Sequence, residues 1–166
     1  DLLEQARPGH VAAAFDESLT SSFRNEIYPA YKANRELPPA DLERQFQLCR
    51  EVTGAMGVAH LADPRYEADD IIGTLTQTCR TAGLASTIVT RDKDLAQLLR
   101  PGDVFLNPVD RRSFQYQDVA AHFGAAPERM ADFQALVGDK VDNIAGVPGI
   151  GAKTAAALFA SFDSLE

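Results

Sequence analysis

Three carboxylates stand within four residues, at Glu67, Asp69 and Asp70, where they open the apolar stretch IIGTLTQTC. At neutral pH these groups repel one another, so a fold that holds them together needs a positive charge among them. Acids in the first turn of a helix are also favoured by the helix dipole, by about 0.3–1 kcal/mol each. An ordinary charged helix start is therefore the competing interpretation, and the positions of the other acids decide between the two.

Short apolar segments alternate with helical patterns along the chain, which predicts an α/β domain with a mostly parallel sheet flanked by helices. The expected strands are residues 10–15, 57–62, 86–90 and 104–107, with a hairpin over 109–116. The expected helices are residues 2–6, 40–56, 66–82, 94–100, 117–123 and 127–138, followed by an Ala-rich helix after Gly151.

Two of these elements carry a prediction about burial. The first strand is nearly all apolar, so we expect it to be buried on both faces. The helix at 40–56 has apolar residues at steps of three and four, which predicts a stripe that packs into the core. This stripe consists of Leu42, Phe46, Cys49, Val52 and Met56.

Acids recur at the ends of the predicted strands. Asp16 ends the first strand, Asp92 and Asp94 follow the strand at 86–90, and Glu67–Asp70 begins the helix after the strand at 57–62. Because sites in parallel sheets gather at the carboxyl ends of the strands, we expect these acids to converge on one rim. Oxygen ligands without His or Cys favour Mg²⁺ or Mn²⁺ over zinc.

The spacing within the acidic helix start gives two ligand directions. Glu67 and Asp70 are three residues apart and share a helical face, whereas Asp69 points elsewhere. Together with Asp92 and Asp94 this is enough for two cations. Paired cations stabilise the attacking and leaving oxygens of an in-line phosphoryl displacement and lower the pKa of a bound water. Such an enzyme needs no side-chain nucleophile, and no Ser or Cys has a recognisable nucleophile setting.

The net charge of −8 argues at first against a nucleic-acid partner. Eight of the 24 acids, however, fall in candidate site clusters, and the remaining acids equal the 16 Lys and Arg residues in number. The eight are Asp16, Glu67, Asp69, Asp70, Asp92, Asp94, Asp139 and Asp142. Bound divalent ions would raise the effective charge further, so the net charge does not exclude nucleic acid.

Two segments have features suited to nucleic acid. Residues 23–35, FRNEIYPAYKANR, interleave aromatics with bases, which suits stacking on bases and pairing with phosphates; an irregular surface segment is the alternative, because Pro29 disrupts a regular helix. The segment VPGIGAKTAAALF combines two glycines, a following helix start and Lys153, a pattern typical of a helix–hairpin–helix that grips a duplex backbone. The alternative for this second segment is a plain structural turn.

The remaining features are those of an ordinary intracellular chain. The length of 166 residues fits one domain, or one domain with a small added module. No run is long and apolar enough for a membrane span, and no signal peptide is evident. Cys49 and Cys79 lack metal spacing, so we interpret them as reduced core residues of a cytosolic protein. His60 has no evident partner and is interpreted as structural.

Four segments together resemble the bacterial 5′→3′ exonuclease/flap endonuclease family, which includes the N-terminal domain of bacterial DNA polymerase I. They are FRNEIYPAYKANR, YEADDIIGTL, VTRDKDLAQLL and ALVGDKVDNIAGVPGIGAKTAAALF, in the family's order. The resemblance implies a PIN-like, resolvase-like nuclease core at residues 1–116, including an arch segment at 23–39. It also implies a helix–hairpin–helix region at 117–166, packed as one unit with the core.

The resemblance also implies roles for individual residues. The metal ligands, for two or more Mg²⁺ or Mn²⁺ ions, would be Asp16, Glu67, Asp69, Asp70, Asp92, Asp94, Asp139 and Asp142. The catalytic residues would be Lys32, Arg35, Asp92 and Asp94. The DNA-binding residues would be Arg24, Tyr31, Lys32, Arg35, Lys93, Gly149, Gly151 and Lys153. A K⁺ ion would be held at the hairpin by the carbonyls of Val147 and Ile150.

This chain departs from the family's pattern in two places. Arg91 stands where the family usually has Gly before the Asp-Lys-Asp sequence, and its long cation could alter the turn or add a phosphate contact. The family also begins with a central strand ending in an Asp metal ligand, and no such strand precedes Asp1. We therefore expect the native chain to extend upstream, and this piece to bind DNA but to cleave it poorly.

The expected protein is a bacterial, cytoplasmic, monomeric nuclease, with no membrane partner, acting on DNA that has a 5′ flap, nick or overhang. One alternative is a non-catalytic DNA-binding module that keeps the hairpin and the arch; such a module has no reason to retain eight mutually repelling acids. Another alternative is a small-molecule phosphatase, which leaves the hairpin and the segment at 23–35 unexplained.

Overall fold

A computed structural model describes residues 2–17 and 22–162, and the chain forms two compact units. Unit 1 comprises residues 1–29 and 35–71, and unit 2 comprises residues 30–34 and 72–166. The boundary at 71/72 falls inside helix α4 (Ala68–Thr81), which carries the acidic run in its first turn and ends before Gly83 at a φ of +74°. Both features of this helix agree with the sequence prediction.

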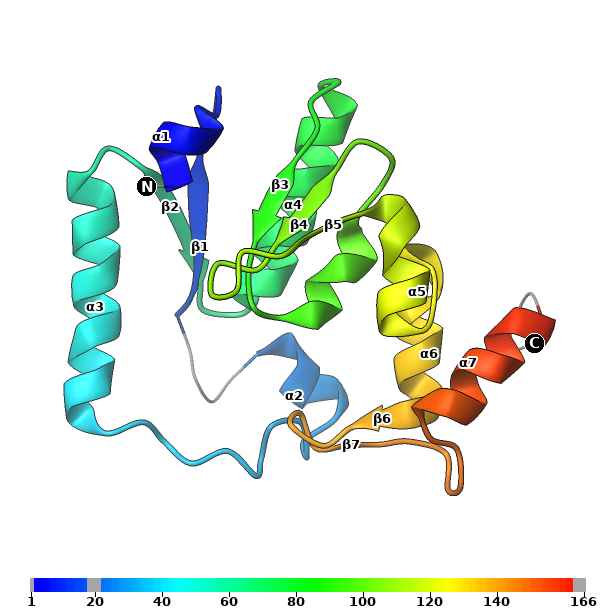
Figure 1. The fold of residues 1–166 in the computed structure, drawn as a ribbon. Coiled ribbons are helices and arrows are strands. Elements are labelled where there is room, and N and C mark those ends of the chain that lie inside the picture. The colour runs from blue at the N-terminus through cyan, green and yellow to red at the C-terminus, as the bar shows by residue number, and fades with distance from the viewer. Residues whose placement is uncertain (1, 18–21, 163–166) are drawn as a thin grey trace. The chain divides into compact units, whose positions relative to one another are not determined.

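Unit 1 is built on two parallel strands, β1 (Ala12–Asp16) and β2 (Ala59–Asp63), drawn side by side in Figure 1. Their register pairs Asp16 with Asp63, so both strands end in a carboxylate at the same edge. The helices of this unit are α1 (Leu2–Ala6), α2 (Phe23–Ile27) and α3 (Ala40–Ala55). Helix α3 lies close to β2, where Gly54 faces the ring of His60.

The burial predicted for unit 1 is wrong. The α3 stripe of Leu42, Phe46, Cys49, Val52 and Met56 is exposed rather than part of the core, and α3 has no buried residue. Strand β1 is only half-buried at Ala13–Phe15. Every buried apolar side chain of the described chain belongs to unit 2. Helical periodicity predicts that a face is apolar, but it does not provide the element that would cover that face.

Unit 2 contains a three-stranded sheet of β3 (Thr87–Val89), β4 (Val104–Leu106) and β5 (Ser113–Gln115). Strands β3 and β4 are parallel, whereas β4 and β5 form an antiparallel hairpin. The hairpin expected over 109–116 corresponds only to its turn and to β5. The helices that follow are α5 (Val119–Phe123), α6 (Met130–Val137) and α7 (Ala152–Ser161). The end of the expected helical region, residues 163–166, lies outside the described residues.

The core of unit 2 fills the space between this sheet and its helices. Its buried members are Ile88, Leu95, Ala96, Leu99, Phe105, Val119, Ala125, Met130, Phe133 and Ala155. Three phenylalanine rings from β4, β5 and α5 pack against one another with centroids about 6 Å apart, the separation that aromatic pairs prefer. These residues are far apart in the sequence, so only the tertiary fold brings them together in one core.

One charged side chain is buried at the border of this core. Asp103 accepts hydrogen bonds from Arg80 Nη2 at 2.9 Å and from the backbone N–H groups of Ser86 and Arg100 at 2.8 and 3.0 Å. A buried carboxylate with three donors is satisfied, so its desolvation cost is offset. We regard Asp103 as structural.

Three local elements differ from the sequence prediction. Residues 94–100 were expected to form a helix, and Lys93–Leu98 form the 3-10 helix η1. Helix α2 forms despite Pro29 because it ends before that proline, at Ile27. A short hairpin of β6 (Gly138–Asp139) and β7 (Ile144–Ala145) was not anticipated. Among residues 2–17 and 22–162, no helix combines the length and apolar character needed to cross a bilayer.

The core assignment predicts a large difference between two valines of unit 2. Val119 is 0% exposed and Val109 is 69% exposed. Val119→Ala should lower the free energy of unfolding by about 2 kcal/mol, because it removes buried methyl groups and leaves a cavity. Val109→Ala should change it by less than about 0.5 kcal/mol. Urea denaturation measures both, and equal effects would contradict this core.

Candidate functional site

In unit 1 the acidic helix start is held by contacts from two other elements. Asp16, at the end of β1, accepts a hydrogen bond from the backbone N–H of Ala68 at 2.7 Å through its Oδ1. Ala68 is the first residue of α4, where N–H groups have no partner within the helix. The Asp16 carboxylate therefore caps α4 from a distant part of the sequence.

The positive charge expected among the acids is Arg24 of α2. Its Nη1 and Nη2 donate to Oδ2 and Oδ1 of Asp70 at 2.7 and 2.8 Å, a bidentate pair, and Nη1 lies 3.8 Å from Oε2 of Glu67. The Glu67 backbone N–H donates to the same Asp70 carboxylate at 3.0 Å. Bidentate Arg–carboxylate pairs are among the strongest charged contacts in proteins. Asp69 is half-buried in the same first turn.

Helix α2 is fixed beside this site by its own cap and by the loop before α4. The Ser22 side chain accepts from the Arg24 N–H, and Asn25 Oδ1 accepts from the Ser22 N–H at 3.0 Å, as in a capping box. The Phe23 N–H donates to the Arg65 carbonyl at 3.0 Å, and the Phe23 and Tyr66 rings lie 5.5 Å apart. These contacts fix the position of α2 and so determine which groups the Arg24 side chain can reach.

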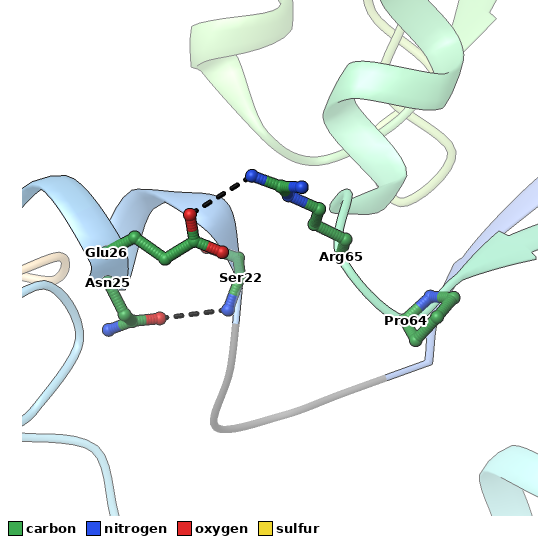
Figure 2. A pocket seen from close by; sticks show the side chains of 5 residues that line it. All are labelled: Ser22, Asn25, Glu26, Pro64 and Arg65. Atoms are coloured by element: carbon green, nitrogen blue, oxygen red, sulfur yellow. Dashed lines mark hydrogen bonds and ion pairs between the residues drawn. The ribbon is translucent and has the colours of Figure 1, made fainter.

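A pocket lies between α2 and the same loop, shown in Figure 2. Its lining residues are Ser22, Asn25, Glu26, Pro64 and Arg65. Glu26 and Arg65 form an ion pair at 3.0 Å, and both side chains are more than half exposed. An exposed ion pair of this kind adds little stability.

In unit 2 the Asp92–Asp94 loop forms the start of η1. Asp92 Oδ1 accepts from the Asp94 N–H at 2.9 Å, which caps this helix. Oδ1 of Asp94 is buried, has no hydrogen bond within the described residues, and lies 3.3 Å from Nζ of Lys93 in an ion pair. Burial raises the pKa of Asp94; Lys93 opposes this rise, and the charges of Asp92 and Asp139 add to it. Asp139 therefore lies within electrostatic reach of this loop.

Asp139 and Asp142 shape the β6–β7 hairpin. Asp139 Oδ1 accepts from the backbone N–H groups of Val141 and Asp142, at 2.8 and 3.3 Å. At the base of the hairpin Gly138, at a φ of +77°, lies so close to Gly146 that a Cβ on Gly138 would clash with the Gly146 nitrogen. Both positions therefore require glycine, and their tight crossing fixes the two acids of the hairpin loop.

The hairpin loop also holds residues 30–34, the middle of the arch segment. The Lys32 N–H donates to the Asp142 carbonyl at 3.0 Å, and the Tyr31 hydroxyl donates to Asp142 Oδ2 at 3.2 Å. The side-chain amides of Asn143 and Asn34 donate to the Ala30 and Lys140 carbonyls, at 2.7 and 3.2 Å.

These contacts orient Lys32 directly. Lys32 has a φ of +55°, and its Nζ lies 4.8 Å from the centroid of the buried Tyr31 ring. Asp142 thus acts on the predicted catalytic Lys32 through backbone and ring contacts. Sequence reasoning missed Asn143 and Asn34 in this role, although Asn143 directly follows Asp142 in the motif GDKVDN.

The predicted helix–hairpin–helix corresponds to α6, the β6–β7 hairpin with the following turn, and α7. The rings of Phe133 and Phe159 join the two helices with centroids 5.9 Å apart. Gly149 has a φ of +82°, and Gly151 directly precedes the first turn of α7. A Cβ added at Gly149 or Gly151 would meet no heavy atom of the described residues within 4 Å, and Lys153 is exposed. The Val147 carbonyl accepts from the Ile150 N–H at 3.0 Å.

The donor chemistry of the site fits hard divalent cations. All predicted ligands are carboxylates, and the buried Oδ1 of Asp94 has only the Lys93 ammonium group as its partner among the described residues. In the present geometry no three His, Cys, Asp or Glu side chains of residues 2–17 and 22–162 are grouped closely enough to hold one ion. Arg24 occupies both oxygens of Asp70.

The structure thus brings the predicted residues together in three groups. The first group surrounds the start of α4 in unit 1 and consists of Arg24, Asp16, Glu67 and Asp70. The second lies in unit 2 and consists of Asp92, Lys93, Asp94 and Asp139. The third, also in unit 2, consists of Tyr31, Lys32 and Asp142. Arg35 is exposed in the segment between α2 and α3. Convergence of Asp16, the acids of 67–70, Asp92 and Asp94 on one rim stays a prediction.

Comparison with known families decides the classification. Residues 1–124 match the model of the 5'-3' exonuclease N-terminal resolvase-like domain, and residues 125–166 match that of the 5'-3' exonuclease C-terminal SAM fold. The chain belongs to the 5'-3' exonuclease family. This confirms both the resemblance and the fold class inferred from the sequence, an α/β nuclease core followed by a helical hairpin domain.

Among curated relatives, the family member DNA polymerase I of Rhizobium leguminosarum is 43% identical over 159 residues, which are 96% of this chain and 16% of that protein. The 5'-3' exonuclease of Aquifex aeolicus is 35% identical over 165 residues, 99% of this chain and 57% of that protein. The chain therefore spans from about a sixth to just over half of these relatives' lengths.

Solved structures agree on the fold. T5 5'-exonuclease with bound zinc has a TM-score of 0.83 at 24% identity, covering 97% of this chain and 63% of that one. The catalytic core of Rad2 in complex with a DNA substrate has a TM-score of 0.57 at 18% identity, covering 93% of this chain and 48% of that one.

The contact between residues 30–34 and the hairpin makes a prediction for two tyrosines. Tyr31 and Tyr116 each donate a hydroxyl hydrogen bond to a carboxylate, at 3.2 and 3.1 Å, but only the Tyr31 pair is part-buried. Tyr31→Phe should lower the free energy of unfolding by about 1 kcal/mol and speed exchange of the Lys32 amide about fivefold. Tyr116→Phe should leave both nearly unchanged; indistinguishable effects of the two substitutions would contradict the role given to Tyr31.

Proposed function

We propose that the protein is a divalent-metal-dependent 5′→3′ exonuclease/flap endonuclease. It hydrolyses phosphodiester bonds near the 5′ end of flapped, nicked or overhanging DNA. The observation that carries this proposal is the pair of carboxylates Asp92 and Asp94, the latter partly buried beside Lys93 and within electrostatic reach of Asp139, in a chain of the 5'-3' exonuclease family. Solved neighbours with bound divalent metal or DNA support the choice of cofactor and substrate.

The proposed metal ligands are the carboxylates of both units. They are Asp16, Glu67, Asp69 and Asp70 in unit 1, and Asp92, Asp94, Asp139 and Asp142 in unit 2. Two or more Mg²⁺ or Mn²⁺ ions bound there would supply a hydroxide nucleophile and stabilise the charge of the leaving oxygen. Such a cation would favour the ionised form of Asp94, which burial disfavours.

The protein's own cations handle the DNA. Lys32, oriented by Tyr31 and Asp142, and Arg35 stabilise the negative charge of the scissile phosphate. Arg24 and Lys93 are further candidates for phosphate contact. At the hairpin, Gly149, Gly151 and Lys153 contact the duplex backbone, where open space beside both glycines permits close approach. A K⁺ ion bound by the Val147 and Ile150 carbonyls would strengthen that contact.

We further propose that the chain acts as a monomer in the bacterial cytoplasm and that residues 1–116 and 117–166 are its nuclease core and its helical region. The two family models meet slightly later, between residues 124 and 125. The polymerase relatives continue far beyond the matched region, which supports a role beside DNA synthesis in replication and repair.

The direct test is cleavage of a labelled 5′-flap duplex. With Mg²⁺ we expect short 5′ products, formed slowly by this 166-residue piece, and with EDTA we expect none. We expect no release of phosphate from a phosphate monoester. Binding of the flap without cleavage under Mg²⁺ and Mn²⁺ would instead indicate a non-catalytic DNA-binding module. Hydrolysis of the monoester alone would indicate a small-molecule phosphatase.

Asp92→Ala should separate catalysis from binding. Loss of this ligand should reduce the cleavage rate by about 100-fold or more, or roughly 3 kcal/mol of transition-state stabilisation. Flap affinity measured in EDTA should stay within about threefold, since removing a carboxylate does not weaken phosphate contacts. Asp132→Ala, on the exposed face of α6, is the matched control and should cleave normally. Normal cleavage by the Asp92 variant would overturn the role of this loop.

A further inference from the structure

Arg24 is the positively charged partner of the carboxylates at the start of α4 in unit 1. Its guanidinium uses two N–H groups on the two oxygens of Asp70, at 2.7 and 2.8 Å, and lies 3.8 Å from Glu67. The three side chains are 30%, 24% and 11% exposed, so solvent screens them only in part. A divalent ion bound to Asp70 needs at least one of the oxygens that Arg24 now occupies.

The position of Arg24 is determined by its surroundings, so this contact is not an accident of a flexible surface side chain. Its helix begins with the Ser22–Asn25 capping box and is tied to the Arg65 carbonyl through the Phe23 N–H. The guanidinium also lies 4.8 Å from the Phe23 ring, a cation–π distance. Because these contacts fix α2, release of Asp70 requires rotation of the long Arg24 side chain and no movement of the helix.

We propose that Arg24 is a positioning residue that competes with divalent cations for Asp70 and Glu67, and so sets the affinity of this carboxylate group for metal. This inference rests on the proposed function, because it assigns a regulator to the same metal ligands. In the absence of metal, Arg24 neutralises part of the charge of Asp70 and Glu67 and holds their carboxylates together. Metal binding releases the guanidinium from at least one Asp70 oxygen, which makes it available to a phosphate.

Competition and simple structural support predict opposite signs. If Arg24 competes, Arg24→Gln removes both a positive charge and a bidentate donor, so divalent ions bind more tightly. If Arg24 only supports the local structure, the same substitution disorders Asp70 and weakens metal binding. The sign of the change therefore tests the proposal without reference to nuclease activity.

The experiment is calorimetric titration of the purified protein with Mn²⁺ alone, with manganese electron paramagnetic resonance as an independent count of bound ions. Arg24→Gln should lower the Kd by about three- to tenfold, the range expected for loss of one partly exposed charge pair. Arg24→Lys keeps the charge but loses the bidentate geometry, so its Kd should fall between the two. Raising the ionic strength should reduce the difference.

Arg65→Gln is the matched control, since it removes the exposed Arg65–Glu26 ion pair of the same unit, and should leave the Kd unchanged. Thermal melts establish that each variant is folded. If the protein without substitutions binds Mn²⁺ and Arg24→Gln leaves the Kd the same or raises it, this inference alone is overturned. Failure of the unchanged protein to bind Mn²⁺ would overturn the metal site and this inference together.

Discussion

Repulsion among the carboxylates at 67–70 is the constraint on which unit 1 depends. Arg24 neutralises part of that charge through Asp70 and Glu67, and Asp16 directs its own carboxylate to the N–H of Ala68. The unit has no buried apolar side chain among its described residues, so these polar contacts account for much of its specificity. Strand β1, helix α2 and the start of α4 are thus tied together by charge rather than by a hydrophobic core.

In unit 2, unlike unit 1, the acids are held by elements that pack on a hydrophobic core. There the cluster from Ile88 to Ala155 supports η1, which holds Asp94 with one buried oxygen and a raised pKa. The β6–β7 hairpin adds Asp139 and fixes Tyr31 and Lys32 through Asp142. Carboxylates held so rigidly are suited to bind a cation, since little order is lost when it arrives.

The sequence was sufficient for the fold class, the family and most element positions, because these depend on periodicity and on motifs with a chemical purpose. Helix α4 with Gly83 and strand β4 were predicted within a few residues. The α3 stripe, including Cys49, was assigned to a core that the structure does not show, because an apolar face does not identify its partner. Helix α2 was missed although Ser22 and Asn25 form a capping box, and Asn143 was missed because its partner Ala30 is 113 residues away.

The central claim is that the acids at the start of α4 exchange a guanidinium for a metal ion. Anomalous diffraction from crystals grown with Mn²⁺ tests it most directly. We expect a manganese peak within about 2.0–2.3 Å of an Asp70 oxygen, with Arg24 withdrawn from at least one of its two present contacts. Manganese bound at other acids while Arg24 keeps both hydrogen bonds to Asp70 would contradict the account.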